Sequence, residues 1–292
     1  TDNLKALADI TVPNAISSTN VTTLEMNSTV TTINVPDASE FKFLPHDLFC
    51  MSDTGGTMAF HHVERDTASA SQEWSKTSLN RFGDFSYSPL ADRCYSVWAS
   101  GTSTYLYGFE RDGLNAAASI GATLLSGAGG VAYDMKNDVL YATDGLSVSD
   151  LHTVDMTTGS SVLVGAMSHN AIRGLAHDPV TDTLYGVTGA SGLLVSVNVS
   201  TGATTAIGTA INASGTKAFY GLAFDKVASL LYTISSGTLY SLTTTGTGTS
   251  IGATSISSAT GLDIIPYQES YVKIEDSDAL AGNEYLCLTK ID

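Results

Sequence analysis

The sequence reads Gly174-Leu175-Ala176-His177-Asp178-Pro179 in the middle of the chain, and this phrase returns along most of its length. Close copies start at Gly130, Gly221 and Gly261, and looser copies start at Glu40 and Asp84. The starts at 40, 84, 130, 174, 221 and 261 are separated by 44, 46, 44, 47 and 40 residues. A period of about 40–50 residues is typical of solenoids, propellers and arrays.

Each phrase is followed by a turn and a second apolar run. The run Thr183-Leu184-Tyr185-Gly186-Val187 is one example, and an aromatic residue recurs in it. The recurring aromatics are Phe49, Tyr95, Tyr141, Tyr185, Tyr232 and Tyr271. Short runs rich in β-branched and aromatic residues, bounded by Gly, Asp and Pro, predict strands.

A third and a fourth run complete the unit. In the clearest copy, residues 193–199 lead through the turn Ser200-Thr201-Gly202 into residues 203–208. Gly and small polar residues between two strand patterns favour hairpin turns. The unit is therefore four short antiparallel strands, which is a propeller blade. A sustained period near 3.6, which would indicate helix, does not occur.

The number of half-units predicts how the ring closes. Six pairs of first and second strands occur, but only five pairs of third and fourth strands follow them. The missing pair is found at the front, in residues 21–36. An incomplete blade would expose an unpaired strand edge. We therefore expect an all-β chain: a six-bladed β-propeller of four-stranded antiparallel blades, in which residues 20–38 complete the last blade. Seven blades, using residues 4–12 as a further strand, is the alternative.

This closure leaves residues 1–19 as an N-terminal arm before a single propeller domain at 20–292. An extended strand in the arm is expected to add to a sheet edge of a neighbouring subunit, so the protein would associate with itself. A disordered tail is the alternative.

Composition narrows the partners. Only 14% of residues are charged, and the net charge of −16 repels nucleic acid and anionic membranes. No apolar run reaches the ~18–20 residues of a membrane span. Thr, Ser, Gly and Ala take the surface positions, which is typical of secreted or virion surfaces. We therefore expect an extracellular location or a virion surface, with a protein or a second copy as partner.

The three cysteines do not predict a disulfide framework. Cys50 and Cys94 fall on second strands of adjacent blades. Facing sheets lie about 10 Å apart, whereas a disulfide needs Cα atoms within roughly 7 Å. Both are expected to be free and buried, and Cys287 is left open.

Loops that enter first strands line one mouth of a propeller channel. The densest polar groups there are His169, Asn170 and Arg173, followed by Lys217 and Tyr220. A loop cluster of this kind predicts a site for an anion or a sugar, so a glycan is a candidate ligand. A solvated loop that packs the rim of the ring is the alternative, and it is favoured.

Metal and catalytic motifs are weak. Asp276 and Asp278 near Glu284 resemble a loose calcium loop without the spacing of a calcium motif, so calcium is the one cofactor left open and a plain acidic turn is favoured. Gly-x-Ser-x-Gly, His-Glu-x-x-His and phosphate-binding loops are missing from the sequence, so no catalytic residue is assigned. Asp134, Asp178 and Asp225 each end a first strand and are expected to cap the next turn.

The stretch at 174–208, with Gly-Leu-Ala-x-Asp-Pro followed by a Ser-Thr-Gly turn, resembles the repeats of extracytoplasmic bacterial β-propellers of the YVTN/NHL-like kind. That resemblance covers residues 130–260 well and the ends poorly. It implies a binding or assembly platform, and propellers also occur in virions. Lactonase and esterase propellers imply the alternative, a metal-dependent hydrolase with its site at the channel mouth. We expect a non-catalytic binding or assembly module.

Overall fold

The computed structural model describes residues 47–77, 81–100, 103–110, 117–145, 149–212, 214–215, 217–265, 271–274 and 284–287. The chain divides into two compact units, one of residues Asp47–Ile265 and one of Thr1–His46 with Pro266–Asp292. In the second unit, β21 (Tyr271–Ile274) pairs with β22 (Glu284–Cys287). The first unit contains the repeats.

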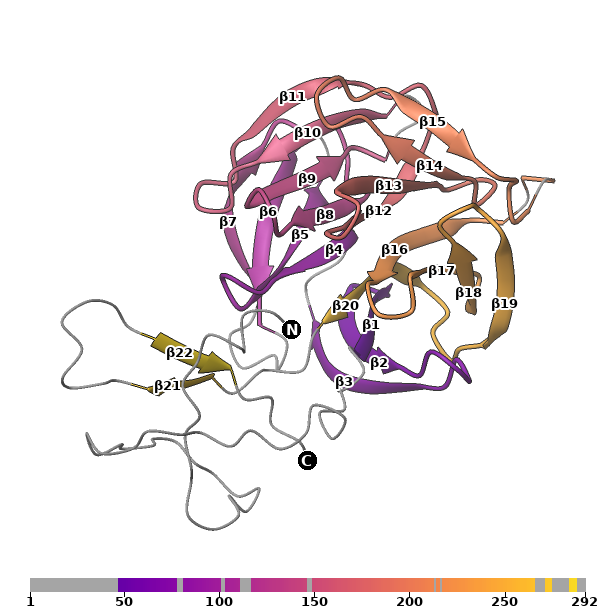
Figure 1. Ribbon diagram of the computed structural model, residues 1–292, viewed down its shortest axis with the longest axis horizontal. Helices are drawn as coiled ribbons and strands as arrows, with labels where there is room; N and C mark the ends of the chain where they lie inside the picture. The colour runs from indigo at the N-terminus through magenta and orange to yellow at the C-terminus, as the bar shows by residue number, and fades with distance from the viewer. Residues whose placement is uncertain are drawn as a thin grey trace, which may run out of the picture. The chain divides into compact units, whose positions relative to one another are not determined.

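The unit Asp47–Ile265 is a β-propeller of five four-stranded antiparallel sheets, whose strands surround a common centre (Figure 1). Blades 1 to 5 have as innermost strands β20 (Ala259–Ile265), β4 (Phe82–Ser88), β8 (Val131–Asp134), β12 (Ile172–Asp178) and β16 (Phe219–Asp225). Their second strands are β1 (Asp47–Thr54), β5 (Arg93–Ser100), β9 (Val139–Thr143), β13 (Thr183–Thr188) and β17 (Leu230–Ser235).

The two outer strands of each blade follow directly along the chain. The third strands are β2 (Thr57–Val63), β6 (Ser103–Phe109), β10 (Asp150–Val154), β14 (Leu194–Val197) and β18 (Thr238–Thr243). The outermost strands are β3 (Ala70–Thr77), β7 (Ala118–Thr123), β11 (Ser161–Ala166), β15 (Thr204–Ile207) and β19 (Gly248–Ala253). Each blade is therefore the four-stranded unit that the repeat predicts.

The expected number of blades is wrong: the ring has five, and neither six nor seven. It closes within blade 1, where β20 pairs antiparallel with β1 and Leu262 lies opposite Cys50. The second strand after the loose copy at Glu40 thus belongs with the copy at Gly261. The two copies had been counted as two blades. Residues 20–38, expected to complete the last blade, are outside the described residues, and Tyr271 lies on β21 instead of a second strand of the ring.

Close packing at the axis explains this choice. The first residue of each phrase forms what we call the axial ring, which consists of Asp84, Gly130, Gly174, Gly221 and Gly261. A Cβ placed on Gly130 would lie 2.7 Å from the backbone carbon of Gly174, and one on Gly261 would lie 2.8 Å from Asp84 Oδ1. Glycine therefore suits four of the five places in the ring, because any side chain there would meet the next strand or Asp84.

Asp84 fills the centre that the glycines leave. Its side chain is fully buried. Oδ1 accepts hydrogen bonds from the backbone N–H groups of Leu262 and Phe85, each at 3.0 Å, and Oδ2 accepts one from Leu175 N–H at 3.2 Å. One carboxyl group thus joins the inner strands of blades 1, 2 and 4.

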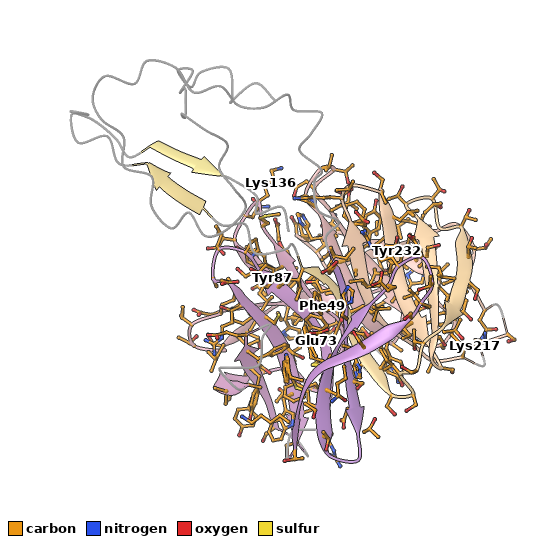
Figure 2. All side chains as sticks on the ribbon, turned by 90° about the horizontal axis from the view of Figure 1, so that it is seen from below. Phe49, Glu73, Tyr87, Lys136, Lys217 and Tyr232 are labelled. Atoms are coloured by element: carbon orange, nitrogen blue, oxygen red, sulfur yellow. The ribbon has the colours of Figure 1, made fainter. Side chains whose placement is uncertain are left out.

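The recurring aromatics pack between the blades. Phe49, Tyr95, Tyr141, Tyr185 and Tyr232 each sit on a second strand and are 5–7% exposed. Phe49 and Tyr232 are labelled among the strands in Figure 2. Burial of such side chains contributes roughly 1.5–3 kcal/mol each. There is one for each of the five blades, which agrees with the blade number.

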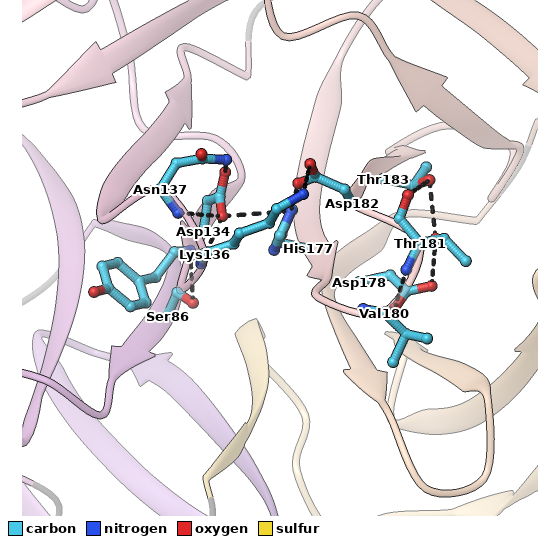
Figure 3. A network of polar contacts seen from close by, with 11 residues as sticks. Ser86, Asp134, Lys136, Asn137, His177, Asp178, Val180, Thr181, Asp182 and Thr183 are labelled. Atoms are coloured by element: carbon cyan, nitrogen blue, oxygen red, sulfur yellow. Dashed lines mark hydrogen bonds and ion pairs between the residues drawn. The ribbon is translucent and has the colours of Figure 1, made fainter. Parts of the chain in front are cut away.

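The aspartates that end the first strands cap the following turns, as predicted. Asp178 Oδ1 accepts the Val180 N–H at 2.8 Å, and its Oδ2 accepts the Thr181 hydroxyl at 2.6 Å (Figure 3). Asp134 and Asp225 bind the equivalent N–H groups two residues further along the chain. These carboxylates stabilise the turns on the side of the ring where the inner strands end.

Other predictions have mixed outcomes. Cys50 and Cys94 are buried and form no disulfide, which confirms this prediction. Within the part of the chain that is described, no helix is long and apolar enough to cross a membrane. The arm at 1–19 and the calcium candidates Asp276 and Asp278 lie outside the described residues, and Glu284 lies on β22. Self-association and calcium therefore stay predictions.

The axial ring gives the first testable prediction. We expect Gly174→Ala to lower the free energy of unfolding by an amount at or above the upper end of the ~1–3 kcal/mol typical of overpacking, because the new methyl group would meet the backbone of Gly221. Chemical denaturation monitored by fluorescence measures the change.

Gly55→Ala is the matched control. Gly55 has a φ of +61° and open space around its missing Cβ, so this change adds backbone strain of about 1 kcal/mol without a clash. An equal or smaller loss for Gly174→Ala would contradict close packing at the axis.

Candidate functional site

A pocket opens at the mouth of the channel, directly above the axial ring. The residue that precedes each ring residue lines it: Gly83, Gly129, Arg173, Tyr220 and Thr260, one from each blade. The remaining lining residues are Phe82, Gly127, Ala128, Asp144 and Gly145. The cavity volume is about 180 Å³, below the ~300–1,000 Å³ of pockets for drug-sized ligands. We call this cavity the mouth pocket, and its size suits a small molecule.

The axial ring lies directly beneath the mouth pocket. Asp84 and the four glycines meet there with no room for a further Cβ, and the Asp84 carboxyl group bridges strands across the axis. The axial ring therefore blocks the channel through the propeller. The site above it is a pocket that can hold a ligand and is closed at the ring.

Arg173 and Tyr220 form the polar wall of the pocket. Arg173 Nη1 donates a hydrogen bond to the Tyr220 phenol oxygen at 2.9 Å, and the guanidinium carbon lies 5.2 Å from the centre of the Tyr220 ring. The side chain of Arg173 runs past Gly189, where a Cβ would come within 2.6 Å of Arg173 Cδ. These contacts fix the guanidinium before any ligand arrives. Its other N–H groups suit a carboxylate or a phosphate.

Asp144 adds a carboxylate to the lining of the same pocket, in which Arg173 supplies the positive charge. It follows β9 in blade 3 and is 4% exposed. Asp144 Oδ1 accepts the Asp150 N–H at 3.3 Å, and Gly145 beside it has a φ of +65°. Thr260, from blade 1, donates its hydroxyl hydrogen to the Met51 carbonyl at 3.3 Å. The pocket therefore offers a cation, a carboxylate and two hydroxyl groups, a set that fits a polar molecule with both an acidic group and hydroxyls.

The structure brings together two of the five residues predicted for this site. Arg173 and Tyr220 line the pocket. His169 turns to Thr204, which its ring Nδ1 meets at 2.8 Å, and Asn170 is exposed. Lys217 donates to the Tyr240 hydroxyl at 2.7 Å and lies at the edge of the ring in Figure 2. The binding role itself stays a prediction for all five.

Sequence reasoning missed Asp144, Thr260 and the lining glycines. The repeat identifies most of them, because the residue before each repeated phrase lines the pocket whatever its side chain is. Gly83 and Gly129 offer no functional group, so a search for polar clusters in one loop passed over them. Asp144 comes from the other end of a second strand, and only the three-dimensional structure places it here.

Two carboxyl groups lie below the pocket, the fully buried Asp84 and the partly buried Asp263. Burial raises the pKa of Asp84 well above its usual range. Burial also raises the pKa of Asp263 to about 7, although hydrogen bonds from Tyr87 N–H, Ile264 N–H and the Ser86 hydroxyl favour its ionised form. The folded protein therefore holds protons on these groups that the unfolded chain has already released near pH 4.

Comparison with known proteins supports the fold and leaves the function open. No protein-family model matches the sequence, and no curated protein matches it significantly. A chain from a crystal structure of a nidogen/laminin complex superposes with a TM-score of 0.54 at 14% identity, covering 74% of this chain and 97% of that one. A structural genomics protein of unknown function from Bacteroides thetaiotaomicron gives 0.50 at 15% identity, covering 75% of this chain and 61% of that one.

A periplasmic gluconolactonase from Pseudomonas aeruginosa superposes more loosely, with a TM-score of 0.43 at 11% identity, covering 70% of this chain and 66% of that one. This superposition is too loose to support an argument about chemistry. At such identities the likenesses show the fold alone. The chain is thus a propeller repeat protein, as its resemblance implied.

The raised pKa values predict how stability depends on pH. Between about pH 4 and pH 7 the folded state binds more protons than the unfolded state, so the free energy of unfolding falls as the pH rises through this range. We expect the melting temperature to increase when the pH is lowered from 7.5 to 5, and we expect Asp263→Asn to reduce this dependence, with Asp84 responsible for the part that remains.

A lower pH also relieves the repulsion of a chain with a net charge of −16. Asp66→Asn, which removes one exposed charge, serves as the control and should keep the full dependence. If both variants show the same slope as the unchanged protein, Asp263 is not a group that retains its proton on folding.

Proposed function

We propose that this protein is a non-catalytic binding module whose ligand enters the mouth pocket. The observation that carries the proposal is the blind cavity of about 180 Å³ in which Arg173 is held by Tyr220. A guanidinium fixed by a neighbouring side chain loses little conformational entropy when it binds an anion. The closely packed axial ring follows directly after these lining residues in the chain, so we expect a ligand to enter from the side away from the ring.

The ligand class follows from the charges of the lining. Arg173 suits a carboxylate, while Asp144 and Thr260 suit hydroxyl groups, so a sugar acid or the acidic end of a glycan fits the lining best. Phe82 and the ring of Tyr220 add apolar surface, against which the carbon face of a sugar packs.

Binding is favoured over hydrolysis because of the residues that line the pocket. Asp144 is the one carboxylate among the described lining residues, and none of them is a histidine, cysteine or serine. A metal-dependent hydrolase needs several oxygen or nitrogen ligands around the reacting centre. The lactonase-type alternative therefore lacks the groups that it would use at this mouth.

We place the module outside the cytoplasm, in an extracellular or virion structure, with a protein or a glycan as partner. Support comes from the sparse charge of 14% and from outer strands rich in Ser, Thr, Gly and Ala, such as β19 and β7. Self-association through residues 1–19 is part of this proposal. Comparing the size in solution of the full chain with that of a 1–19 deletion tests it.

Isothermal titration with glucuronate and galacturonate, and with glucose and galactose as their uncharged counterparts, tests the ligand class. We expect the acids to bind about 10- to 100-fold more tightly, because a hydrogen bond to a charged group contributes roughly 1.5–3 kcal/mol. Arg173→Met should remove this preference.

Lys217→Met is the matched control. It removes a lysine whose ammonium lies 5.4 Å from the Tyr240 ring centre and which does not line the pocket, so it should bind as the unchanged protein does. Equal binding of acids and neutral sugars, or equal losses in both variants, would contradict the proposal. Turnover of lactones or esters that depends on Arg173 would support the hydrolase instead.

A further inference from the structure

His177 lies between two carboxylates at the end of the ring opposite the mouth pocket. Its Nε2 is 3.2 Å from Asp182 Oδ1 and 3.6 Å from Asp134 Oδ1 (Figure 3). His177 and Asp182 belong to blade 4, and Asp134 ends the inner strand of blade 3. The side chains of His177 and Asp134 are 2% and 3% exposed, whereas Asp182 is 40% exposed. Among the described residues, this is a cluster whose ligand atoms all lie within 4.8 Å of one another.

Neighbouring groups hold both carboxylates in place. Asn137 Nδ2 donates to Asp134 Oδ2 at 2.8 Å, and Lys136 Nζ binds Asp182 Oδ2. In each case the supporting side chain takes Oδ2, and Oδ1 is the oxygen that faces His177. Asp134 Oδ1 also accepts the N–H groups of Lys136 and Asn137 at 2.9 and 3.1 Å. Hydrogen-bonded ligands of this kind are typical of metal sites, where outer groups orient the ligands.

The other blades provide an internal comparison. At the blade 2–3 boundary the equivalent residues are Ser88, Tyr133 and Asp138, and the Tyr133 hydroxyl donates to Asp138 Oδ1 at 2.7 Å. At the blade 4–5 boundary they are Asp178, Phe224 and Ser229. A contact between the aromatic position and the turn position is therefore part of the repeat. Of these described boundaries, only that between blades 3 and 4 has a metal-ligating group in all three places.

The two separations between the histidine nitrogen and the carboxylate oxygens match a tetrahedral metal. Zinc binds histidine nitrogen at about 2.0–2.1 Å and carboxylate oxygen at about 2.0–2.2 Å, which separates neighbouring ligand atoms by roughly 3.3 Å. The separations of 3.2 and 3.6 Å around Nε2 bracket this value. One nitrogen and two carboxylate oxygens suit zinc better than calcium, because calcium prefers oxygen ligands alone.

The geometry points to a zinc site formed by Asp134, His177 and Asp182, with a fourth position open to water on the exposed side of Asp182. A zinc ion there connects the inner strand of blade 3 to blade 4. It therefore stabilises the ring at one boundary, and it does so independently of the mouth pocket. Lys136 keeps its place on Asp182 Oδ2 and orients that carboxylate.

Zinc and cobalt binding to the full chain test this site. After equilibration with ZnCl₂ in a buffer without chelating groups and then desalting, we expect one zinc per chain by elemental analysis. Co²⁺ in place of zinc should give the strong visible absorption of a tetrahedral complex. His177→Phe and Asp182→Ser introduce the residues that blade 5 has at these places, so both variants should fold.

Loss of a residue that only supports a metal ligand weakens binding by about 10- to 100-fold. Each of these variants removes a ligand itself, so each should weaken zinc binding by more than that. His169→Phe is the matched control, since it removes a histidine of blade 4 that contacts Thr204 instead. The zinc site would be overturned if the unchanged protein retained no zinc. It would also be overturned if the His177→Phe and Asp182→Ser variants bound zinc as tightly as the control variant. Circular dichroism confirms that each variant is folded.

Discussion

The close approach of five inner strands at one axis constrains the rest of the molecule. Four of the axial positions hold glycine, and a Cβ at any of them would come too close to the next strand or to Asp84. The fifth holds Asp84, whose carboxyl group accepts backbone hydrogen bonds from blades 1, 2 and 4. Burial disfavours the charged form of Asp84 and raises the pKa of its carboxyl group, although the backbone hydrogen bonds by themselves favour the ionised form.

Both candidate sites depend on this constraint. Because the axis is filled by Asp84 and the glycines, the channel becomes a blind pocket on one side, and the residues just before the ring, including Arg173 and Tyr220, face into it. On the other side the same strands end in capping aspartates and tight turns. There the repeat places three fixed positions at the described boundaries between blades 2 and 3, 3 and 4, and 4 and 5. At the boundary between blades 3 and 4 those three residues are ligands for a metal.

The sequence predicted the blade well and the ring less well. The phrase, the recurring tyrosines and the turn aspartates give the strands of the repeats between residues 130 and 253 as they occur in the structure. The predicted number of blades was wrong because the copies at Glu40 and Gly261 were counted as the first strands of two blades. In the structure the second strand β1 pairs with β20, which contains the copy at Gly261. Packing at the axis distinguishes them, and that packing becomes visible only when the five strands are placed side by side. In the same way, Arg173 and Tyr220 were found as polar residues in entering loops, whereas Asp144, Asp134 and Asp182 were not, since their neighbours come from distant parts of the chain.

The pairing of β1 with β20 is the central claim, and a cross-strand disulfide measures it most directly. Leu48 and Ile264 lie opposite each other. Antiparallel partners have Cα atoms about 4.5–5.5 Å apart, within reach of a disulfide. In a Cys287→Ser background, Leu48→Cys with Ile264→Cys should oxidise to one bridge in the folded monomer, identified by peptide mapping without reductant. If both thiols remain free in folded protein, the two strands belong to separate blades about 10 Å apart, and the five-bladed ring is wrong.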